Sequence, residues 1–232
     1  MREVVFDTET TGLNPIGGDR MVEIGCVEIV NRIETGRHFH AYFNPERDMP
    51  LEAEAVHGLS TLFLSGKPRF SEKVDELLEF IEDSPLVAHN AGFDFGFLNT
   101  ELERCGRGAV SMGRMVDTLT LARARHPGAK HSLDALCVRF GIDRSHRVKH
   151  GALLDAQLLA QIYVELTGGR QIGLGLIAET RLVEVQASAG PITVREPRPA
   201  RAHAPLVEEL ERHRAFIAKL ANPLWERFLR GG

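Results

Sequence analysis

The hydrophobic positions of the chain form short strand-like runs first and longer helical stripes later. The apolar runs that predict strands are Val4–Phe6, Val22–Val30, Phe39–Phe43 and Leu86–Ala88, and a further short strand is predicted near Arg114–Asp117. The segments whose periodicity predicts helices are Leu51–His57, Phe70–Ile81, the stretch after Asp94, Ser132–Phe140 and Ala152–Leu166. Hairpin strands followed by alternating strands and helices predict an α/β fold, in which helices pack on a mixed sheet.

The character of the chain changes after Gly168-Gly169, which ends the last of these helical patterns. The segment Ala187–Pro205 is rich in Pro, Ala and Arg, which is typical of a flexible, extended linker with little to bury. Between Val207 and Leu224 apolar residues recur at spacings of three and four and predict a C-terminal amphipathic helix. We therefore expect a domain over residues 1–169, a linker over 170–205 and a helical tail over 206–232.

Two carboxylates follow the first apolar run directly. Asp7 and Glu9 are two residues apart, so their side chains point to the same face of an extended chain. Carboxylates aimed at one point repel each other unless a cation lies between them. Hard divalent cations such as Mg²⁺ and Mn²⁺ prefer such oxygen ligands. Taken alone, the pair also fits a solvated acidic loop after a strand.

Two more carboxylates lie near the starts of later helices. Asp94 closes the motif His-Asn-Ala-Gly-Phe-Asp in a first helical turn, where the helix dipole by itself also favours a carboxylate. Asp155 lies beside the apolar stripe of a predicted helix, an unfavourable place for an unpartnered carboxylate. His150 precedes that helix, and a histidine can accept a proton near neutral pH, although an exposed loop histidine is the alternative. His131 precedes a different helix start, and we interpret it as structural.

These blocks resemble the DEDD superfamily of 3'-to-5' exonucleases in its histidine-bearing branch. The motifs that carry the resemblance are Asp-x-Glu after a strand, His-Asn-Ala-x-Phe-Asp before a helix and His-Gly-Ala-Leu-Leu-Asp-Ala in a helix. Within that branch, residues 1–169 are similar to the DnaQ-like proofreading (epsilon) subunits of bacterial DNA polymerase III, which also share Val56-His57-Gly58 and the stretch Ser132–Cys137. The resemblance implies a ribonuclease-H-like sheet and a DNA exonuclease of the bacterial cytoplasm.

The resemblance also implies a role for each matching residue. The carboxylates that would hold two Mg²⁺ or Mn²⁺ ions are Asp7, Glu9, Asp94 and Asp155. His150 would take the proton from the attacking water, and the product would be a nucleoside 5'-monophosphate. The residues that would bind the terminal nucleotide of a DNA 3' end are Asp7, Glu9, Thr10, Leu13, His57, Asn90, Phe93 and Asp155. Stacking of Phe93 on an unpaired base contributes about 1–3 kcal/mol, and a core position at its helix start is the alternative.

Two segments of the C-terminal region resemble docking sequences. Residues 171–176 are similar to the glutamine-and-leucine peptides that bind the sliding clamp, with an ordinary apolar linker or a final strand as the alternative. Their candidate contacts are Gln171, Leu174 and Leu176. An amphipathic helix after a long linker either folds back or lies in the groove of a partner. In the family that partner is the polymerase catalytic subunit, and the candidate anchors are Leu220, Leu224, Trp225 and Phe228.

Composition narrows the class of function further. Of 232 residues, 43% are hydrophobic, which is enough for one core, and we expect neither a leader peptide nor a membrane segment. The three cysteines have no metal-ligand spacing, so we expect reduced thiols in the cytoplasm. The formal net charge of −4 predicts weak DNA binding by the chain alone, because phosphate neutralisation dominates affinity for nucleic acids. A partner is therefore expected to bring the chain to DNA.

Three functions are compatible with these patterns. The first is an editing exonuclease tethered to a replicative DNA polymerase. The second is a free-standing enzyme that trims RNA or oligonucleotide 3' ends, which would not need the linker and the terminal helix. The third is a non-catalytic adaptor that stabilises the polymerase, and the complete set of catalytic residues argues against it.

Overall fold

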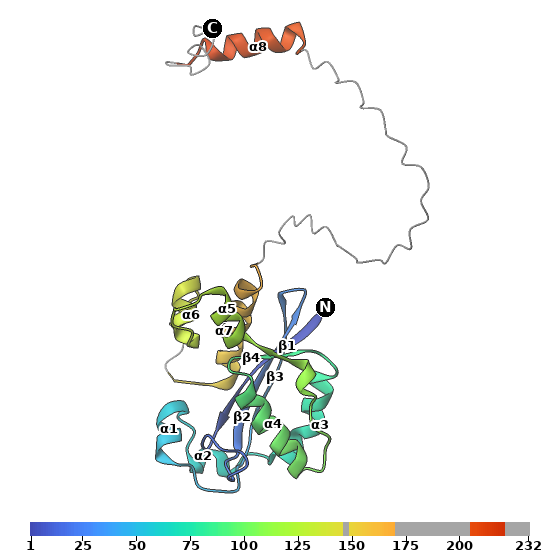
Figure 1. The fold of residues 1–232 in the computed structure, drawn as a ribbon, viewed down its shortest axis with the longest axis vertical. Coiled ribbons are helices and arrows are strands. Elements are labelled where there is room, and N and C mark those ends of the chain that lie inside the picture. Colours follow the sequence, from blue (N-terminus) through green and yellow to red (C-terminus); the bar gives the residue numbers. More distant parts are fainter. Residues whose placement is uncertain (146–148, 170–204, 221–232) are drawn as a thin grey trace, which may run out of the picture. The chain divides into compact units, whose positions relative to one another are not determined.

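The computed structural model describes residues 1–145, 149–169 and 205–220, and the first two ranges contain a five-stranded mixed sheet covered by helices (Figure 1). The strands are β1 (Arg2–Thr10), β2 (Met21–Val30), β3 (Ile33–Tyr42), β4 (Leu86–Ala88) and β5 (Met115–Asp117). The helices of this part are α1 (Leu51–His57), α2 (Thr61–Ser65), α3 (Phe70–Ile81), α4 (Gly92–Arg104), α5 (Thr118–Arg125), α6 (Leu133–Phe140) and α7 (Ala152–Leu166), with a 3₁₀ turn at Met112–Arg114.

The sheet has the strand order β3-β2-β1-β4-β5. Strands β1, β2 and β3 form an antiparallel meander, whereas β4 and β5 run parallel to β1 and to each other. Antiparallel neighbours need only short turns, while the parallel strands are joined through helical crossovers. The predicted α/β fold with a mixed sheet is confirmed.

Alternate positions of β1 face two different layers of helices. Val4 and Phe6 are buried in the core that contains residues of α3 and α4, and the ring of Phe6 lies edge-on to Phe95 with centroids 5.7 Å apart. Val5 is buried in a second core together with Leu159 of α7. Since side chains alternate along a strand, the parity of a position in β1 decides which helices it meets.

This alternation continues through the acidic motif. Strand β1 extends to Thr10 because it stays paired with β2, with Asp7 opposite Gly25 and Glu9 opposite Glu23. The strand therefore continues beyond the predicted apolar run Val4–Phe6. Val5, Asp7 and Glu9 are two positions apart in this strand, so their side chains lie on the same face of the sheet. Because Val5 packs against α7, this is the face that α7 covers.

Helix α7 begins in direct contact with β2. A Cβ atom on Gly25 would lie 2.3 Å from both N and Cα of Leu153, so only glycine permits this approach. The helix has the bounds that its apolar stripe predicted, and Asp155 lies in its first turn. The close approach therefore fixes the distance between Asp155 and the sheet.

Other boundaries differ from the sequence-based expectation for identifiable reasons. Strand β3 begins at Ile33, six residues before the predicted start at Phe39, because a tight hairpin pairs Ile33 with Val30. Helices α2 and α5 were not predicted. Helix α5 (Thr-Leu-Thr-Leu-Ala-Arg-Ala-Arg) lacks a clear amphipathic pattern, and it is started by Asp117, whose side chain accepts a hydrogen bond from the N–H of Leu119. The three cysteines are free thiols.

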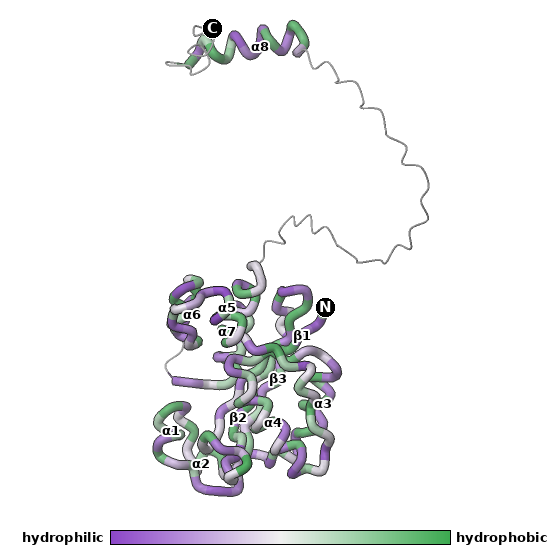
Figure 2. Tube along the Cα trace, viewed as in Figure 1, coloured by the Kyte–Doolittle hydropathy of each residue, from purple (hydrophilic) through white to green (hydrophobic). Residues whose placement is uncertain are grey.

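The described part of the tail contains one helix, α8 (Val207–Ile217), within the range predicted to be helical. Hydrophobic and hydrophilic turns alternate along it (Figure 2), and Val207, Leu210 and Phe216 are exposed. Leu220 is described and 46% exposed. The predicted contacts that lie outside the described residues are Gln171, Leu174, Leu176, Leu224, Trp225 and Phe228. Within the described ranges, no helix is both long and apolar enough to cross a membrane.

Candidate active site

Three predicted catalytic residues meet at one point of the domain. Potential ligand atoms of Glu9, His150 and Asp155 all lie within 4.8 Å of one another. Nδ1 of His150 is 3.3 Å from Oδ2 of Asp155, and the imidazole is half exposed while the carboxylate is buried. Two carboxylates and a solvent-accessible imidazole thus come together from strand β1, the segment before α7 and the first turn of α7. His131, in contrast, has Nε2 2.8 Å from the carbonyl oxygen of His126.

Asp94 is the buried carboxylate on the α4 side of β1. It lies in the first turn of α4 and is 3% exposed. Thr8 lies on the face of β1 that α4 covers, and its hydroxyl donates to Oδ1 of Asp94 at 2.7 Å. Burial raises the pKa of Asp94 to about 7, against the opposing effect of the Thr8 hydrogen bond. Asp94 is therefore held in place while the ionised form remains costly.

Asp7 lies within electrostatic reach of all the other predicted metal-binding carboxylates. Burial raises the pKa of Asp7 well above its ordinary value, and Asp94, Glu9 and Asp155 raise it further, in that order. Such a concentration of carboxylates favours a divalent cation, because the cation offsets both the desolvation and the mutual repulsion. The residues present fit a site for divalent metal ions.

A cavity of about 330 Å³ opens beside these carboxylates. The predicted site residues that line it are Glu9, Thr10, Leu13, His57 and Phe93. Asn90 is not among its lining residues and lies in the turn before α4, with a φ of 62°. Leu13 is 83% exposed at the rim. The cavity therefore combines apolar and aromatic surface with the carboxylates of Glu9 and Glu52, and such a mixture of apolar walls and few polar groups is typical of a ligand site.

His57 is a buried residue that lines this cavity. Its Nδ1 accepts a hydrogen bond from the N–H of Leu59 at 3.0 Å, so the ring hydrogen is assigned to Nε2. Burial lowers the pKa of His57. The ring can therefore donate one hydrogen bond without carrying a charge.

Sequence reasoning missed one buried carboxylate close to this site. Glu23 is 3% exposed, lies opposite Glu9 in the β1–β2 ladder, and has Oε1 2.7 Å from Nε2 of His40. It contributes to the raised pKa of Asp7, after the larger effects of burial, Asp94, Glu9 and Asp155. The available signal was a glutamate inside the otherwise apolar run Met21–Val27.

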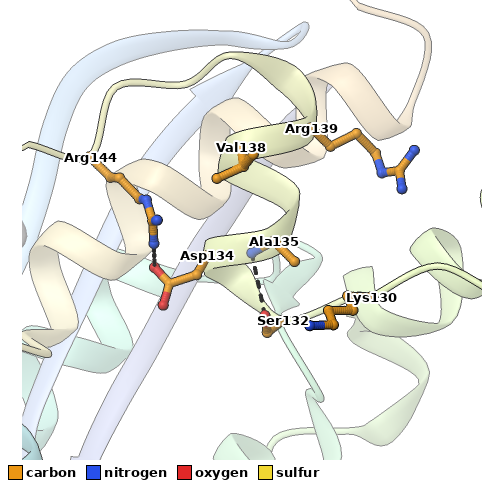
Figure 3. Close-up of a pocket in the computed structure, with 7 residues that line it drawn as sticks. All are labelled: Lys130, Ser132, Asp134, Ala135, Val138, Arg139 and Arg144. Atoms are coloured by element: carbon orange, nitrogen blue, oxygen red, sulfur yellow. Dashed lines mark hydrogen bonds and ion pairs between the residues drawn. The ribbon is translucent and has the colours of Figure 1, made fainter.

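A larger cavity of about 720 Å³ is lined by residues of α6 and of the segments that flank it (Figure 3). Its lining residues are Lys130, Ser132, Asp134, Ala135, Val138, Arg139 and Arg144. Asp134 is paired with Arg144 at 2.5 Å, and Ser132 caps the helix through the N–H of Ala135. Because none of the five predicted catalytic residues lines it, the smaller cavity is the candidate active site.

Comparisons with known proteins agree with this geometry. The exonuclease family profile matches residues 4–163, which covers more than half of the chain, so the chain belongs to the exonuclease family. This superfamily depends on divalent metal ions. The DNA polymerase III subunit epsilon of Rickettsia typhi is 47% identical over 231 residues, covering 95% of this chain and 97% of the relative, and that of Escherichia coli is 42% identical over 224 residues. The chain thus belongs, within that class, to the DNA polymerase III epsilon subunit family.

Solved structures support the fold at lower identity. Exonuclease X in complex with 5' overhanging duplex DNA is 24% identical, with a TM-score of 0.56 over 71% of this chain and 90% of that chain. A zinc-bound complex of E. coli exonuclease I with single-stranded DNA is 18% identical, with a TM-score of 0.63 over 73% of this chain and 41% of that chain. The described domain therefore has the ribonuclease-H-like fold that the sequence motifs implied.

Proposed function

We propose that this chain is the proofreading 3'-to-5' exonuclease of a replicative DNA polymerase and releases nucleoside 5'-monophosphates from mispaired DNA 3' ends. The observation that carries the proposal is the convergence of Glu9, Asp155 and His150 beside a cavity with the mixed lining of a ligand site. The names of the relatives, DNA polymerase III subunit epsilon, support the polymerase context.

The carboxylates divide naturally between two metal positions. Two Mg²⁺ or Mn²⁺ ions would be held by Asp7 with Glu9 and Asp155 on the α7 side, and by Asp7 with Asp94 on the α4 side. When bound, such ions stabilise the negative charge that develops on the phosphoryl oxygens during in-line displacement. The two positions are separate because Asp155 and Asp94 come from helices that cover opposite faces of the sheet.

The remaining residues bind the strand end and move one proton. Thr10, Leu13 and Phe93 would contact the terminal nucleotide in the 330 Å³ cavity, and the Nε2–H of His57 would donate to an oxygen of it. His150, half exposed and beside Asp155, would accept the proton of the attacking water. Asn90 would also contact the terminal nucleotide, from the turn that precedes α4.

A direct assay tests the proposal. The purified full chain with Mg²⁺ should shorten a 5'-labelled DNA oligonucleotide from its 3' end, release 5'-monophosphates, and act faster on a mispaired than on a paired end. EDTA should stop the reaction. A matched RNA oligonucleotide that is degraded as fast as DNA would instead favour a free-standing RNA trimmer, and a chain without any nuclease activity would favour an adaptor.

His150→Ala is expected to lower the turnover number by about 10²–10⁴-fold, because the attacking water loses its proton acceptor. Metal affinity should change much less than turnover, since the carboxylates remain. The rate of the variant should also lose the decline at acidic pH that a protonated base would cause. Steady-state kinetics across pH measure both effects, and His131→Ala is the matched control. A His131→Ala variant that altered the pH profile, with His150→Ala unchanged, would assign the base to the other histidine.

The tail is proposed to tether the nuclease to the polymerase catalytic subunit. Apolar side chains of α8 are exposed, and the net charge of −4 argues against strong independent binding to DNA. A domain over residues 1–169, a linker over 170–205 and a docking tail over 206–232 would keep the nuclease at high local concentration beside the primer end. The same linker would present residues 171–176 to the sliding clamp. This assembly would work in the bacterial cytoplasm.

Truncation after Gly169 should leave single-strand nuclease activity unchanged and abolish co-elution with the polymerase catalytic subunit. In the full chain, Trp225→Ala with Phe228→Ala should weaken that contact, because buried aromatic anchors tend to dominate interfaces. Arg212→Ala is a control on the same tail, since this side chain is exposed and bonds the carbonyl of Glu208 in its own helix. Equal co-elution of the truncated and full chains would place the docking surface on the nuclease domain.

A further inference from the structure

The carboxylate of Asp117 lies beside the turn that leads into α4. Strands β4 and β5 are parallel, and Ala88 at the end of β4 is in register with Asp117 at the end of β5. Oδ1 of Asp117 accepts hydrogen bonds from the backbone N–H groups of Asn90 at 3.0 Å, Ala91 at 3.4 Å and Leu119 at 3.0 Å. Oδ2 accepts from the hydroxyl of Thr120 at 2.8 Å. One side chain therefore links two chain segments that follow adjacent strands.

Within the turn that Asp117 holds, the N–H of Phe93 donates to the carbonyl of Asn90 at 2.9 Å, but the backbone at Asn90 is strained. Asn90 has a φ of 62°, in the left-handed region that non-glycine residues seldom adopt. Ala91, the residue at the N-cap position of α4, makes no side-chain capping bond. Such a backbone persists only when its surroundings fix it, and the carboxylate of Asp117 supplies two of the contacts that do so.

Thr118 strengthens the same junction from inside the core. It is fully buried, and its hydroxyl donates to the carbonyl of Ala88 at 3.2 Å. The Thr118 oxygen also lies within hydrogen-bond distance of Nδ1 of His89, at 2.8 Å. The end of β4 and the start of the turn are thus tied to β5 through two consecutive residues.

We propose that Asp117, supported by Thr118, is a positioning residue that fixes the Asn90–Asp94 turn and thereby the metal-binding carboxylate of Asp94. The inference rests on the proposed metal site. Asp117 is a positioning residue and not itself a metal ligand, since its two oxygens already accept four hydrogen bonds. Asp94 is four positions after Asn90, so a displaced turn moves the start of α4 and with it the carboxylate bonded to Thr8. None of the sequence motifs had pointed to this residue.

Mn²⁺ binding to the full-length chain, measured by calorimetry, tests this role without relying on turnover. Asp117→Ala should weaken binding by about 10-fold, as loss of a group that orients a metal ligand typically does. Asp117→Asn should recover most of the affinity, because its amide oxygen can still accept from Asn90 and Leu119. At low Mn²⁺ concentration, hydrolysis of a DNA oligonucleotide should fall with the affinity, and added Mn²⁺ should restore it.

Ser132→Ala is the matched control, since it removes a helix N-cap of the same domain outside the site, where Ser132 Oγ accepts from the N–H of Ala135 at 3.3 Å. It should lower the melting temperature and leave Mn²⁺ affinity unchanged. If Asp117→Ala fails to fold, Asp117→Asn and Thr118→Val carry the comparison, each with a smaller loss of affinity. The inference would be overturned if the Asp117 and Thr118 variants bound Mn²⁺ with wild-type affinity, or if Ser132→Ala lost as much Mn²⁺ affinity as they do. A wild-type chain that binds no Mn²⁺ would instead overturn the proposed function.

Discussion

Asp7→Ala is expected to abolish hydrolysis, with a rate at least about 10³-fold below wild type, because metal ions contribute several kcal/mol of transition-state stabilisation. Asp7 is the carboxylate that lies within electrostatic reach of both Asp94 and Asp155, so its loss affects both proposed metal positions. Single-strand DNA hydrolysis with saturating Mg²⁺ is the measurement. Near-normal activity of this variant would contradict the two-metal assignment.

The same site predicts an unusual gain in stability for the metal-free protein. Burial and neighbouring carboxylates raise the pKa of Asp7, so ionised Asp7 opposes folding, and Asp7→Asn should raise the melting temperature in EDTA. Each 1 kcal/mol of relieved repulsion corresponds to about 2–4 °C for a chain of this size.

The pH dependence follows from the sign of the shifts. A carboxyl whose folded-state pKa is raised, as that of Asp7 is, favours folding below its unfolded-state pKa, and that contribution is lost as pH rises through the folded-state value. The gain from Asp7→Asn should therefore be larger at about pH 8 than at about pH 4. Thermal melts in EDTA at both values check this, and a gain that is equal at both would remove the electrostatic explanation. Added Mg²⁺ should stabilise wild type more than the variant.

Local patterns determine much of this fold. The stripe of α7 predicted its bounds because an amphipathic helix shows a period that few other structures produce, and the spacing of Asp7 and Glu9 predicted their common face. Helix α5 was missed because its start is specified by Asp117 and its packing by α7, neither of which appears in the composition of residues 118–125. Short helices that depend on tertiary contacts carry a weak local signal.

The candidate site divides in the same way. Residues with chemical character, such as Asp94 and His150, could be identified from motifs. Residues that only hold them in place could not, since the partner of Asp117 is a turn 26 to 27 residues away and the glutamate opposite Glu9 lies in a different strand. Gly25 is the extreme case, because its function is to have no side chain where the backbone of α7 passes.

Gly25→Ala is therefore expected to damage both stability and catalysis, although it adds a single methyl group at a residue that does not line the candidate substrate cavity. Its Cβ would lie 2.3 Å from N and Cα of Leu153 and 2.4 Å from the carbonyl carbon of Ala152. Backbone atoms cannot rotate away as a side chain can, so α7 must move outward. Overpacking of this kind typically costs about 1–3 kcal/mol and occasionally more.

The movement would carry Asp155 away from Glu9 and Asp7. A misplacement of about 1 Å in a catalytic constellation can cost about 10²-fold in rate, and stabilisation by added Mg²⁺ should shrink in parallel. Thermal melts with and without Mg²⁺, together with exonuclease rates, measure both losses.

Gly96→Ala separates steric displacement from a general effect of replacing glycine. Gly96 lies inside α4, and its added Cβ would meet only Cγ of Pro15 at 3.8 Å. Alanine there should stabilise the protein by about 0.5–1 kcal/mol, because it restricts the unfolded chain and favours the helix, and it should leave the rate unchanged. Wild-type stability and activity in Gly25→Ala would show that α7 approaches β2 less closely than the glycine contact implies. The position of Asp155 would then have to be set by other contacts of α7.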